Sequence, residues 1–121
     1  MGIRVLVVDD HPDVADSTAL LLRLLGYVSR ACYSGDECLA CVEQFGPQVI
    51  LLDLMMPKLD GFDTCDRIRQ VPGFRDVPII ALSALDTTLV EVRAANSRFA
   101  CRLGKPADAQ LVKAAIEQAL N

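Results

Sequence analysis

The sequence predicts an α/β protein with a doubly wound, five-stranded parallel sheet and five helices on its two faces. Short apolar runs rich in Val, Ile and Leu alternate along the chain with longer segments of helical periodicity. These runs lack polar alternation, which is typical of parallel strands that are covered on both faces. Five strand–helix units with right-handed crossovers favour the strand order 2-1-3-4-5, which is common at this length.

The expected strands differ in how apolar they are. The first, third and fourth runs are continuous, whereas the second and fifth contain more polar residues and are therefore placed nearer the sheet edges. The five expected strands are Arg4–Val8, Val28–Cys32, Val49–Leu52, Pro78–Leu82 and Phe99–Leu103.

Helical spacing and end signals predict the segments between the strands. Pro12 suits a first helical turn, Gly26 can end that helix, and Gly46-Pro47 closes the second one. The apolar faces are expected at Val14, Thr18, Leu21, Leu22 and Leu25 in the first helix and at Leu111, Val112, Ala115, Ile116 and Ala119 in the last. The remaining helices are expected around Cys38–Phe45, Phe62–Ile68 and Asp86–Ala95, and the last helix over Asp108–Leu120.

Length and composition predict one domain over residues 1–121 with a core of its own. Apolar residues make up 52% of the 121 residues and charged residues 23%. The net charge of −4 provides no basic footprint for direct nucleic-acid binding or for an anionic membrane surface. No segment resembles a targeting signal or a membrane span, so we expect a cytoplasmic protein.

Five cysteines are expected to be reduced core residues rather than metal ligands or disulfides. Cys38 and Cys41 form a C-x-x-C pair, but no second pair of ligands stands at the spacing of a zinc site. Both fall inside an expected helix, whereas a redox motif would follow a strand. Core packing is therefore the favoured interpretation.

Polar side chains gather where the expected strands end. Asp9 and Asp10 follow the first strand and Asp53 follows the third, while Ser83 and Lys105 follow the fourth and fifth. Ligands of such sheets bind beyond the carboxyl ends of the strands. Two carboxylates about 4 Å apart repel by ~4 kcal/mol at an effective dielectric near 20, so the cluster must take up protons or bind a cation. Oxygen ligands of this kind favour Mg²⁺, which commonly bridges carboxylates and phosphoryl oxygens.

This pattern predicts phosphoryl transfer, with Asp53 as the nucleophile. Asp9 and Asp10 would hold Mg²⁺, and the backbone carbonyl of Met55 could add a neutral ligand. Lys105 and Ser83 would meet phosphoryl oxygens. The simpler interpretations remain open for single residues, since the Asp pair could cap a helix and a lone serine or lysine is uninformative. His11 is interpreted as a residue of the helix start or of the rim.

These residues resemble the receiver domain of bacterial response regulators, which has the same flavodoxin-like topology. The similar stretches are VLVVDDH (5–11), VILLDLMMPKLDGFD (49–63), VPIIALSA (77–84) and LGKP (103–106). The resemblance implies that Asp53 is the phosphoacceptor and that Asp9, Asp10, Asp53 and the Met55 carbonyl bind Mg²⁺. It also implies that Ser83 is the switch hydroxyl, that Lys105 is the lysine typical of the family, and that the peptide bond before Pro106 is cis. Pro57 and Gly61 would shape the loop after Asp53, where glycine permits unusual dihedral angles.

The resemblance further implies a phosphoacceptor rather than an enzyme with a separate substrate, although the domain assists its own phosphorylation and dephosphorylation. The phosphoryl donor would be a sensor histidine kinase or a phosphotransfer protein. An output partner would bind the face formed by the fourth helix, fifth strand and last helix, and a phosphorylation-dependent homodimer is allowed. Arg102 stands where the family often has an aromatic residue, so either an output role or a solvated edge position is open for it.

Three alternatives belong to other classes. A receiver-like binding module would lack part of the site, which is complete here. A phosphohydrolase with an Asp nucleophile usually has a second Asp two residues later, where this chain has Met55. A flavodoxin-like cofactor binder would need a glycine-rich first loop to hold a phosphate, and the loop after Asp10 contains no glycine.

Overall fold

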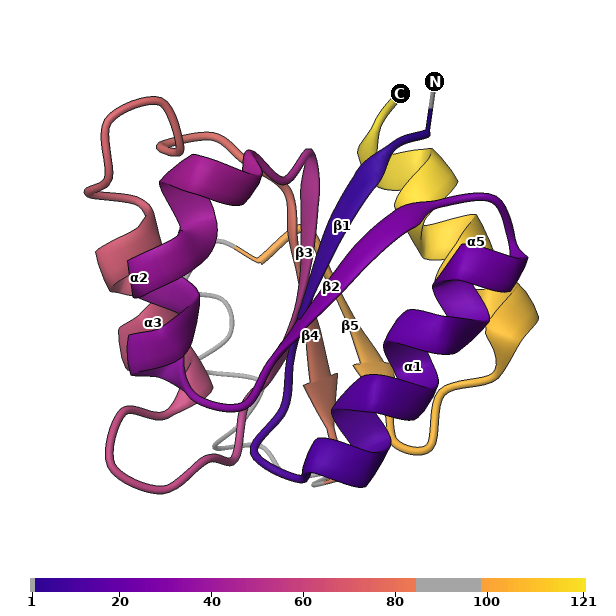
Figure 1. Cartoon of the computed structure of the whole chain (residues 1–121), viewed down its shortest axis with the longest axis horizontal. Helices are drawn as coiled ribbons and strands as arrows, with labels where there is room; N and C mark the ends of the chain where they lie inside the picture. The colour runs from indigo at the N-terminus through magenta and orange to yellow at the C-terminus, as the bar shows by residue number, and fades with distance from the viewer. Residues whose placement is uncertain (1, 85–98) are drawn as a thin grey trace.

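A five-stranded parallel sheet with the order β2-β1-β3-β4-β5 forms the middle layer of the protein (Figure 1). The structure is a computed structural model that describes residues 2–84 and 99–121. This order and the parallel pairing confirm the predicted fold class. The strands are β1 (Arg4–Val8), β2 (Val28–Cys32), β3 (Val49–Asp53), β4 (Ile79–Ser83) and β5 (Cys101–Gly104).

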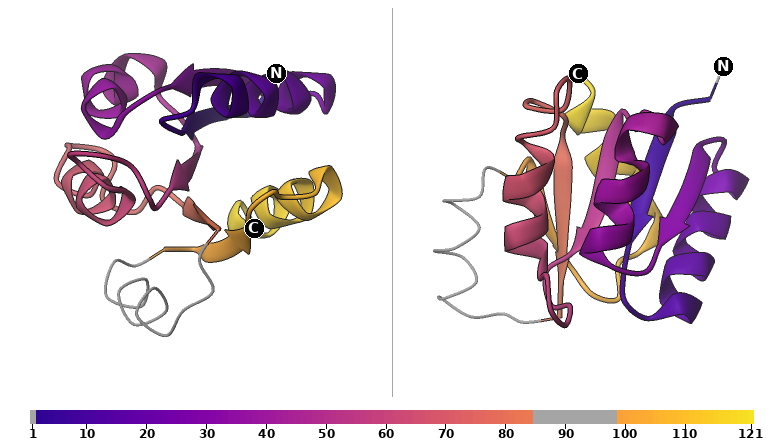
Figure 2. Two further views of the ribbon diagram at one scale, coloured as in Figure 1. Left: turned by 90° about the horizontal axis from the view of Figure 1, so that it is seen from below. Right: turned by 60° about the vertical axis from the view of Figure 1, so that its left-hand side comes forward.

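Helices cover both faces of the sheet. Figures 1 and 2 show α1 and α5 on one face and α2 and α3 on the other. The helix expected over Asp86–Ala95 lies outside the described residues. In the described part of the chain, no helix combines the length and the apolar character needed to cross a membrane. The helices are α1 (Pro12–Leu24), α2 (Gly35–Phe45), α3 (Gly61–Ile68) and α5 (Ala109–Ala119).

Burial on both faces explains why the central strands are continuously apolar. Alternate residues of β1 contribute to different core clusters, with Leu6 on the α2–α3 side and Val5 on the α1–α5 side. All five residues of β3 and of β4 are buried. Because neither face meets water, these strands need no polar alternation, and their hydrophobic burial fixes the sheet in the centre of the molecule.

Short-range capping sets the helix ends. Pro12 opens α1, as the sequence predicts, and Gly46 ends α2 in the left-handed conformation with φ of 65°. The side chains of Ser34, Asp60 and Asp108 each accept a hydrogen bond from a backbone N–H in the first turn of α2, α3 and α5. The cap at Asp60 thus sets the start of α3 at Gly61, directly after the loop that follows β3.

The inward faces of two helices differ from the prediction. In α1 the buried residues are Ala15, Ala19 and Leu22, whereas Val14 is 42% exposed. In α5, Val112 and Ile116 are buried, but Leu111 is 58% exposed. Small residues let a helix approach the sheet closely, so the tertiary packing selects a face that includes alanines over the most apolar one.

The fifth strand and its cysteine also depart from the prediction. β5 begins at Cys101 rather than Phe99, and the Phe99 ring instead packs edge-to-face on Phe62 with centroids 5.9 Å apart. Cys101 is exposed on this edge strand, so its expected place in the core is wrong, whereas the other four cysteines are free and buried as predicted. An edge strand has one neighbour fewer, which leaves its outer side chains in contact with water.

Candidate functional site

Parallel pairing aligns the ends of the strands and brings the predicted site residues to one rim. Val8 pairs with Leu52 in β3, Asp53 pairs with Leu82, and Ser83 pairs with Gly104. The residues that follow these pairs therefore meet, although they are up to 96 positions apart in the sequence. Asp9 and Asp53 are 1% and 3% exposed, so their charges must be satisfied by neighbours within the protein.

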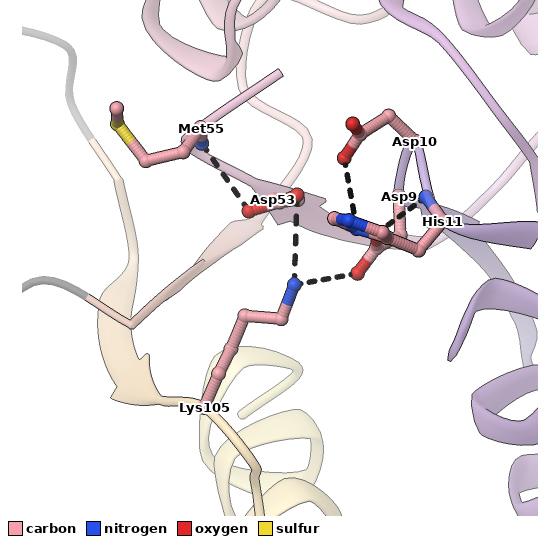
Figure 3. A network of polar contacts seen from close by, with 6 residues as sticks. All are labelled: Asp9, Asp10, His11, Asp53, Met55 and Lys105. Atoms are coloured by element: carbon pink, nitrogen blue, oxygen red, sulfur yellow. Dashed lines mark hydrogen bonds and ion pairs between the residues drawn. The ribbon is translucent and has the colours of Figure 1, made fainter. Parts of the chain in front are cut away.

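Lys105 is the cation that the rim supplies (Figure 3). Its Nζ donates a hydrogen bond to Oδ2 of Asp9 at 2.7 Å and lies 3.5 Å from Oδ2 of Asp53. Burial alone would lower the pKa of Lys105, but the hydrogen bond to Asp9 and the charges of Asp53 and Asp9 outweigh burial and raise it. Lys105 therefore stays protonated between two buried carboxylates.

The surroundings of Asp53 disfavour the ionised form of its carboxyl group. Burial raises its pKa to about 6, and the charge of Asp9 and a side-chain hydrogen bond with Asp10 act in the same direction. Lys105 and the backbone N–H of Met55, which donates to Oδ1 of Asp53 at 3.2 Å, oppose this shift. At neutral pH the carboxylate is thus mostly ionised, but it is poorly solvated and available to an electrophile.

We expect the stability of the metal-free protein to fall as pH rises through the range from 3.8 to about 6. A carboxyl whose pKa is raised by folding favours the folded state only while it is protonated, so its contribution is complete below 3.8 and is lost above about 6. We expect a loss of about 1–2 kcal/mol, because water reaches part of the rim.

Urea unfolding in EDTA at several pH values measures this effect. The Asp53→Asn variant is the control, since the amide does not titrate and this part of the pH dependence should disappear. A carbon-13 NMR titration that places the Asp53 midpoint at or below 4 in the metal-free protein would contradict the expectation.

The oxygen atoms of the rim fit a hard divalent cation. Ligand atoms from Asp9, Asp10, His11 and Asp53 all lie within 4.8 Å of one another. In the described part of the chain, Oδ1 of Asp10 is buried without a hydrogen-bond partner. A buried acceptor of this kind is costly unless a donor or a cation meets it. Lys105 offsets one of the three carboxylate charges, so the acidic cluster has both the charge and the oxygen donors that suit Mg²⁺.

The remaining predicted residues, Met55 and Ser83, lie at the same rim. The Met55 side chain is 53% exposed, which leaves the backbone of this residue as the part that faces Asp53. Ser83 is buried at the end of β4, between β3 and β5, and its carbonyl accepts a hydrogen bond from the N–H of Lys105, which follows β5, at 3.0 Å. The structure therefore gathers Met55 and Ser83 around Asp53 with the acidic pair and the lysine.

His11 lies at the start of α1 and at the rim, as interpreted from the sequence, and its ring also contacts the acidic pair. It is the N-cap residue of α1, and its Nδ1 lies 3.3 Å from Oδ1 of both Asp9 and Asp10. Its backbone N–H also donates to Asp9 at 3.0 Å. The sequence signal for this contact was that His11 directly follows Asp9 and Asp10. A residue in the short turn between β1 and α1 stays close to the end of β1.

The loop after Asp53 is shaped differently from the expectation. Gly61 does not adopt a positive φ, whereas Lys58 does, with φ of 64°. A Cβ atom on Gly61 would lie 2.4 Å from the carbonyl oxygen of Asp53 and 2.6 Å from Cα of Leu54. Glycine is therefore required here for space, because the first turn of α3 packs on the backbone at the end of β3. The Lys105-Pro106 bond is cis, as predicted.

The fold and the rim together define a class of signalling domain that accepts a phosphoryl group at the carboxyl edge of a parallel sheet. The family model of the response regulator receiver domain matches residues 5–117. The chain belongs to this family, which confirms the resemblance. Its members are phosphoaccepting switches of two-component signalling.

Curated relatives extend beyond the part that resembles this chain. The DNA-binding dual master transcriptional regulator RpaA of Synechocystis sp. is 32% identical over 118 residues, which are 98% of this chain and 49% of RpaA. Protein PilG of Pseudomonas aeruginosa is 34% identical over 85 residues, 70% of this chain and 63% of PilG. The chain thus spans less than two thirds of either protein.

Solved structures share the fold over nearly the whole chain. Chemotaxis protein CheY4 of Vibrio cholerae superposes with a TM-score of 0.94 at 22% identity, covering 99% of this chain and 100% of CheY4. A putative response regulator from Chloroflexus aurantiacus gives a TM-score of 0.91 at 29% identity, covering 99% and 98%. The first of these similarities supports the fold alone.

Proposed function

We propose that this chain is a single receiver domain, over residues 1–121, that accepts a phosphoryl group on Asp53 and thereby changes which partners it binds. One observation carries this proposal. Asp53 is a buried carboxylate at a strand end, with Lys105 on one side and, on the other, the acidic pair Asp9 and Asp10, of which Oδ1 of Asp10 has no hydrogen-bond partner among the described residues. Such an arrangement stores an electrostatic imbalance that a phosphoryl group and a cation together would relieve.

In the proposed reaction, a carboxylate oxygen of Asp53 attacks the phosphorus of a phosphohistidine, and the bond between phosphorus and the imidazole nitrogen breaks. The product is an acyl phosphate, in which a dianionic group replaces a single charge. Lys105 need move little to pair with the new oxygens, because its Nζ is already 3.5 Å from Asp53. The Ser83 hydroxyl would donate to another phosphoryl oxygen.

Asp9, Asp10, Asp53 and the Met55 carbonyl would hold Mg²⁺. When bound, this ion supplies neutralisation of the carboxylates and of the charge on the phosphoryl oxygens. The Asp10 oxygen without a hydrogen-bond partner supports this assignment, because a cation would satisfy it. Lys105 already pairs with Asp9, so the lysine and the ion would share the three negative charges between them.

The proposed partners follow from this chemistry. The donor would be a sensor histidine kinase or a phosphotransfer protein. The domain would then act as a phosphoacceptor rather than as an enzyme with its own substrate, and it would do so in the cytoplasm. Output would pass through the face that includes β5, α5 and Arg102, either to another protein or to a second copy of the domain. The net charge of −4 supports placing nucleic-acid and membrane contacts outside this domain.

Incubation with acetyl phosphate tests the proposal without knowledge of the kinase. We expect the intact mass to increase by one phosphoryl group in the presence of Mg²⁺ and to stay unchanged in EDTA. Borohydride reduction followed by peptide mapping should place the modification on Asp53. An unchanged mass with Mg²⁺, under conditions where a known receiver domain is modified, would overturn the proposal.

A further inference from the structure

Two buried thiols from different elements are in direct contact, away from the rim. Cys32 ends β2 and Cys41 lies within α2, and their Sγ atoms are 3.2 Å apart. They are 0% and 5% exposed, and both are free thiols. The Cys41 thiol also donates to the backbone carbonyl oxygen of Cys38 at 3.5 Å. The sulfur of Cys41 therefore contacts the sulfur of Cys32 and only the backbone of Cys38, its neighbour in the C-x-x-C pair.

We propose that Cys32 and Cys41 are a modification site, at which oxidation by a peroxide closes a reversible disulfide between the end of β2 and α2. A disulfide bond is about 2.05 Å long, so the two sulfur atoms must approach each other by little more than 1 Å. The thiols lie in the same core cluster, so neither must cross the sheet to reach the other. The contact therefore needs only a small shift of α2 on the sheet.

The reaction balances with a peroxide as the only oxidant. The Cys41 sulfur attacks a peroxide oxygen, the O–O bond breaks, and Cys41 becomes a sulfenic acid while the peroxide is reduced to water or an alcohol. Cys32 then attacks the Cys41 sulfur, and the sulfenic hydroxyl leaves as water with the thiol proton. Cys41 reacts first because it is the more exposed of the two.

Burial makes this site slow rather than inert. Burial is the main cause that raises the pKa of Cys32, with the hydrogen bond to Cys41 acting in the same direction, and it raises the pKa of Cys38 to about 12. Since the thiolate is the reactive form, we expect these thiols to resist mild oxidants and to react only on sustained exposure to peroxide. Cys101 is exposed and should react sooner, so the test below replaces it with serine.

The position of Cys32 connects this modification to the acidic rim. The Cys32 carbonyl accepts a hydrogen bond from the N–H of Asp9 at 3.0 Å. A shift of Cys32 toward Cys41 therefore acts on the backbone of Asp9 through one hydrogen bond. An effect on Mg²⁺ affinity would rest on the proposed function, whereas the disulfide itself does not.

The test uses hydrogen peroxide on the full chain with Cys101→Ser, which prevents links between molecules. We expect the intact mass to fall by two hydrogen atoms and to recover with dithiothreitol. Cleavage after Glu37 separates Cys32 from Cys41, so oxidised protein should give a disulfide-linked peptide pair. Amide NMR spectra should show a displaced Asp9 resonance after oxidation, in EDTA and therefore independently of phosphorylation.

Matched variants identify the partner thiols. The linked pair should persist in Cys38→Ala and in Cys65→Ala, and it should disappear in both Cys41→Ala and Cys32→Ala, with folding checked by circular dichroism. A link that persists in Cys41→Ala would assign the bond to Cys38 and overturn the proposal. Sulfinic acid on Cys41 without any linked peptide would also overturn it, and an unmoved Asp9 resonance would overturn the connection to the rim.

Discussion

Replacing Asp53 with asparagine is expected to abolish the phosphoryl-dependent increase in mass while leaving the fold intact. An amide has no ionised oxygen that can act as the nucleophile. It has nearly the same size as the carboxylate, so the 3% exposed position stays filled and no cavity forms. Intact-protein mass spectrometry after incubation with acetyl phosphate and Mg²⁺ measures the result, for which we expect no detectable modification.

The same substitution should stabilise the protein when Mg²⁺ is absent. Asparagine removes a buried negative charge next to Asp9, which should raise the free energy of unfolding by about 1 kcal/mol near pH 7.5. Asp63→Asn is the matched control, because Asp63 is exposed in the first turn of α3 and should leave phosphorylation unchanged. If Asp53→Asn were still modified and mapping placed the phosphoryl group on Asp9 or Asp10, the nucleophile would have to be reassigned.

Replacing Gly61 with alanine is expected to destabilise the domain by about 2–4 kcal/mol and to lower its melting temperature by roughly 10 °C. Helix propensity alone predicts the opposite sign, because alanine is favoured over glycine in a helix by up to about 1 kcal/mol. The added Cβ, however, would lie 2.4 Å from the Asp53 carbonyl oxygen and 2.6 Å from Leu54 Cα. Both are backbone atoms of the central layer, which cannot move as a flexible side chain would.

Thermal and urea unfolding of Gly61→Ala measure this effect, and Gly104→Ala is its control. A Cβ on Gly104 would meet no atom within 4 Å, so that variant should stay within about 0.5 kcal/mol of the parent protein. We also expect slower phosphorylation of Gly61→Ala, because the strain displaces the backbone that carries Asp53. A variant as stable as the parent protein would show that α3 can move away from β3 at little cost.

The features that depend on local chemistry could be read from the sequence. Continuous apolar runs predicted the strands of the central sheet, and Pro12 and Gly46 marked helix ends correctly. The site could be anticipated for a related reason. In a parallel sheet every strand end faces the same rim, so Asp9, Asp53 and Lys105 meet wherever the strand order is right.

The features that depend on distance and shape could not be read in this way. Periodicity placed Val14 and Leu111 in the core, but packing against the sheet favoured faces that contain small residues. Cys101 was predicted to lie in the core, but the structure exposes it, because the sequence did not show which side chains of the edge strand face water. The need for glycine at position 61 arises from a backbone contact with β3 that no local pattern records.

The sequence by itself determined the class of fold, the order of its elements and the set of polar residues that meet at the rim. It did so because burial on both faces and the chain-wise order of strands restrict the topology to very few arrangements. Only the tertiary structure decided that Lys105 bonds to Asp9 more closely than it approaches Asp53, and that Cys41 meets Cys32 rather than its neighbour in the C-x-x-C pair. These choices depend on differences of about 1 Å between side chains of separate elements, and close packing settles them.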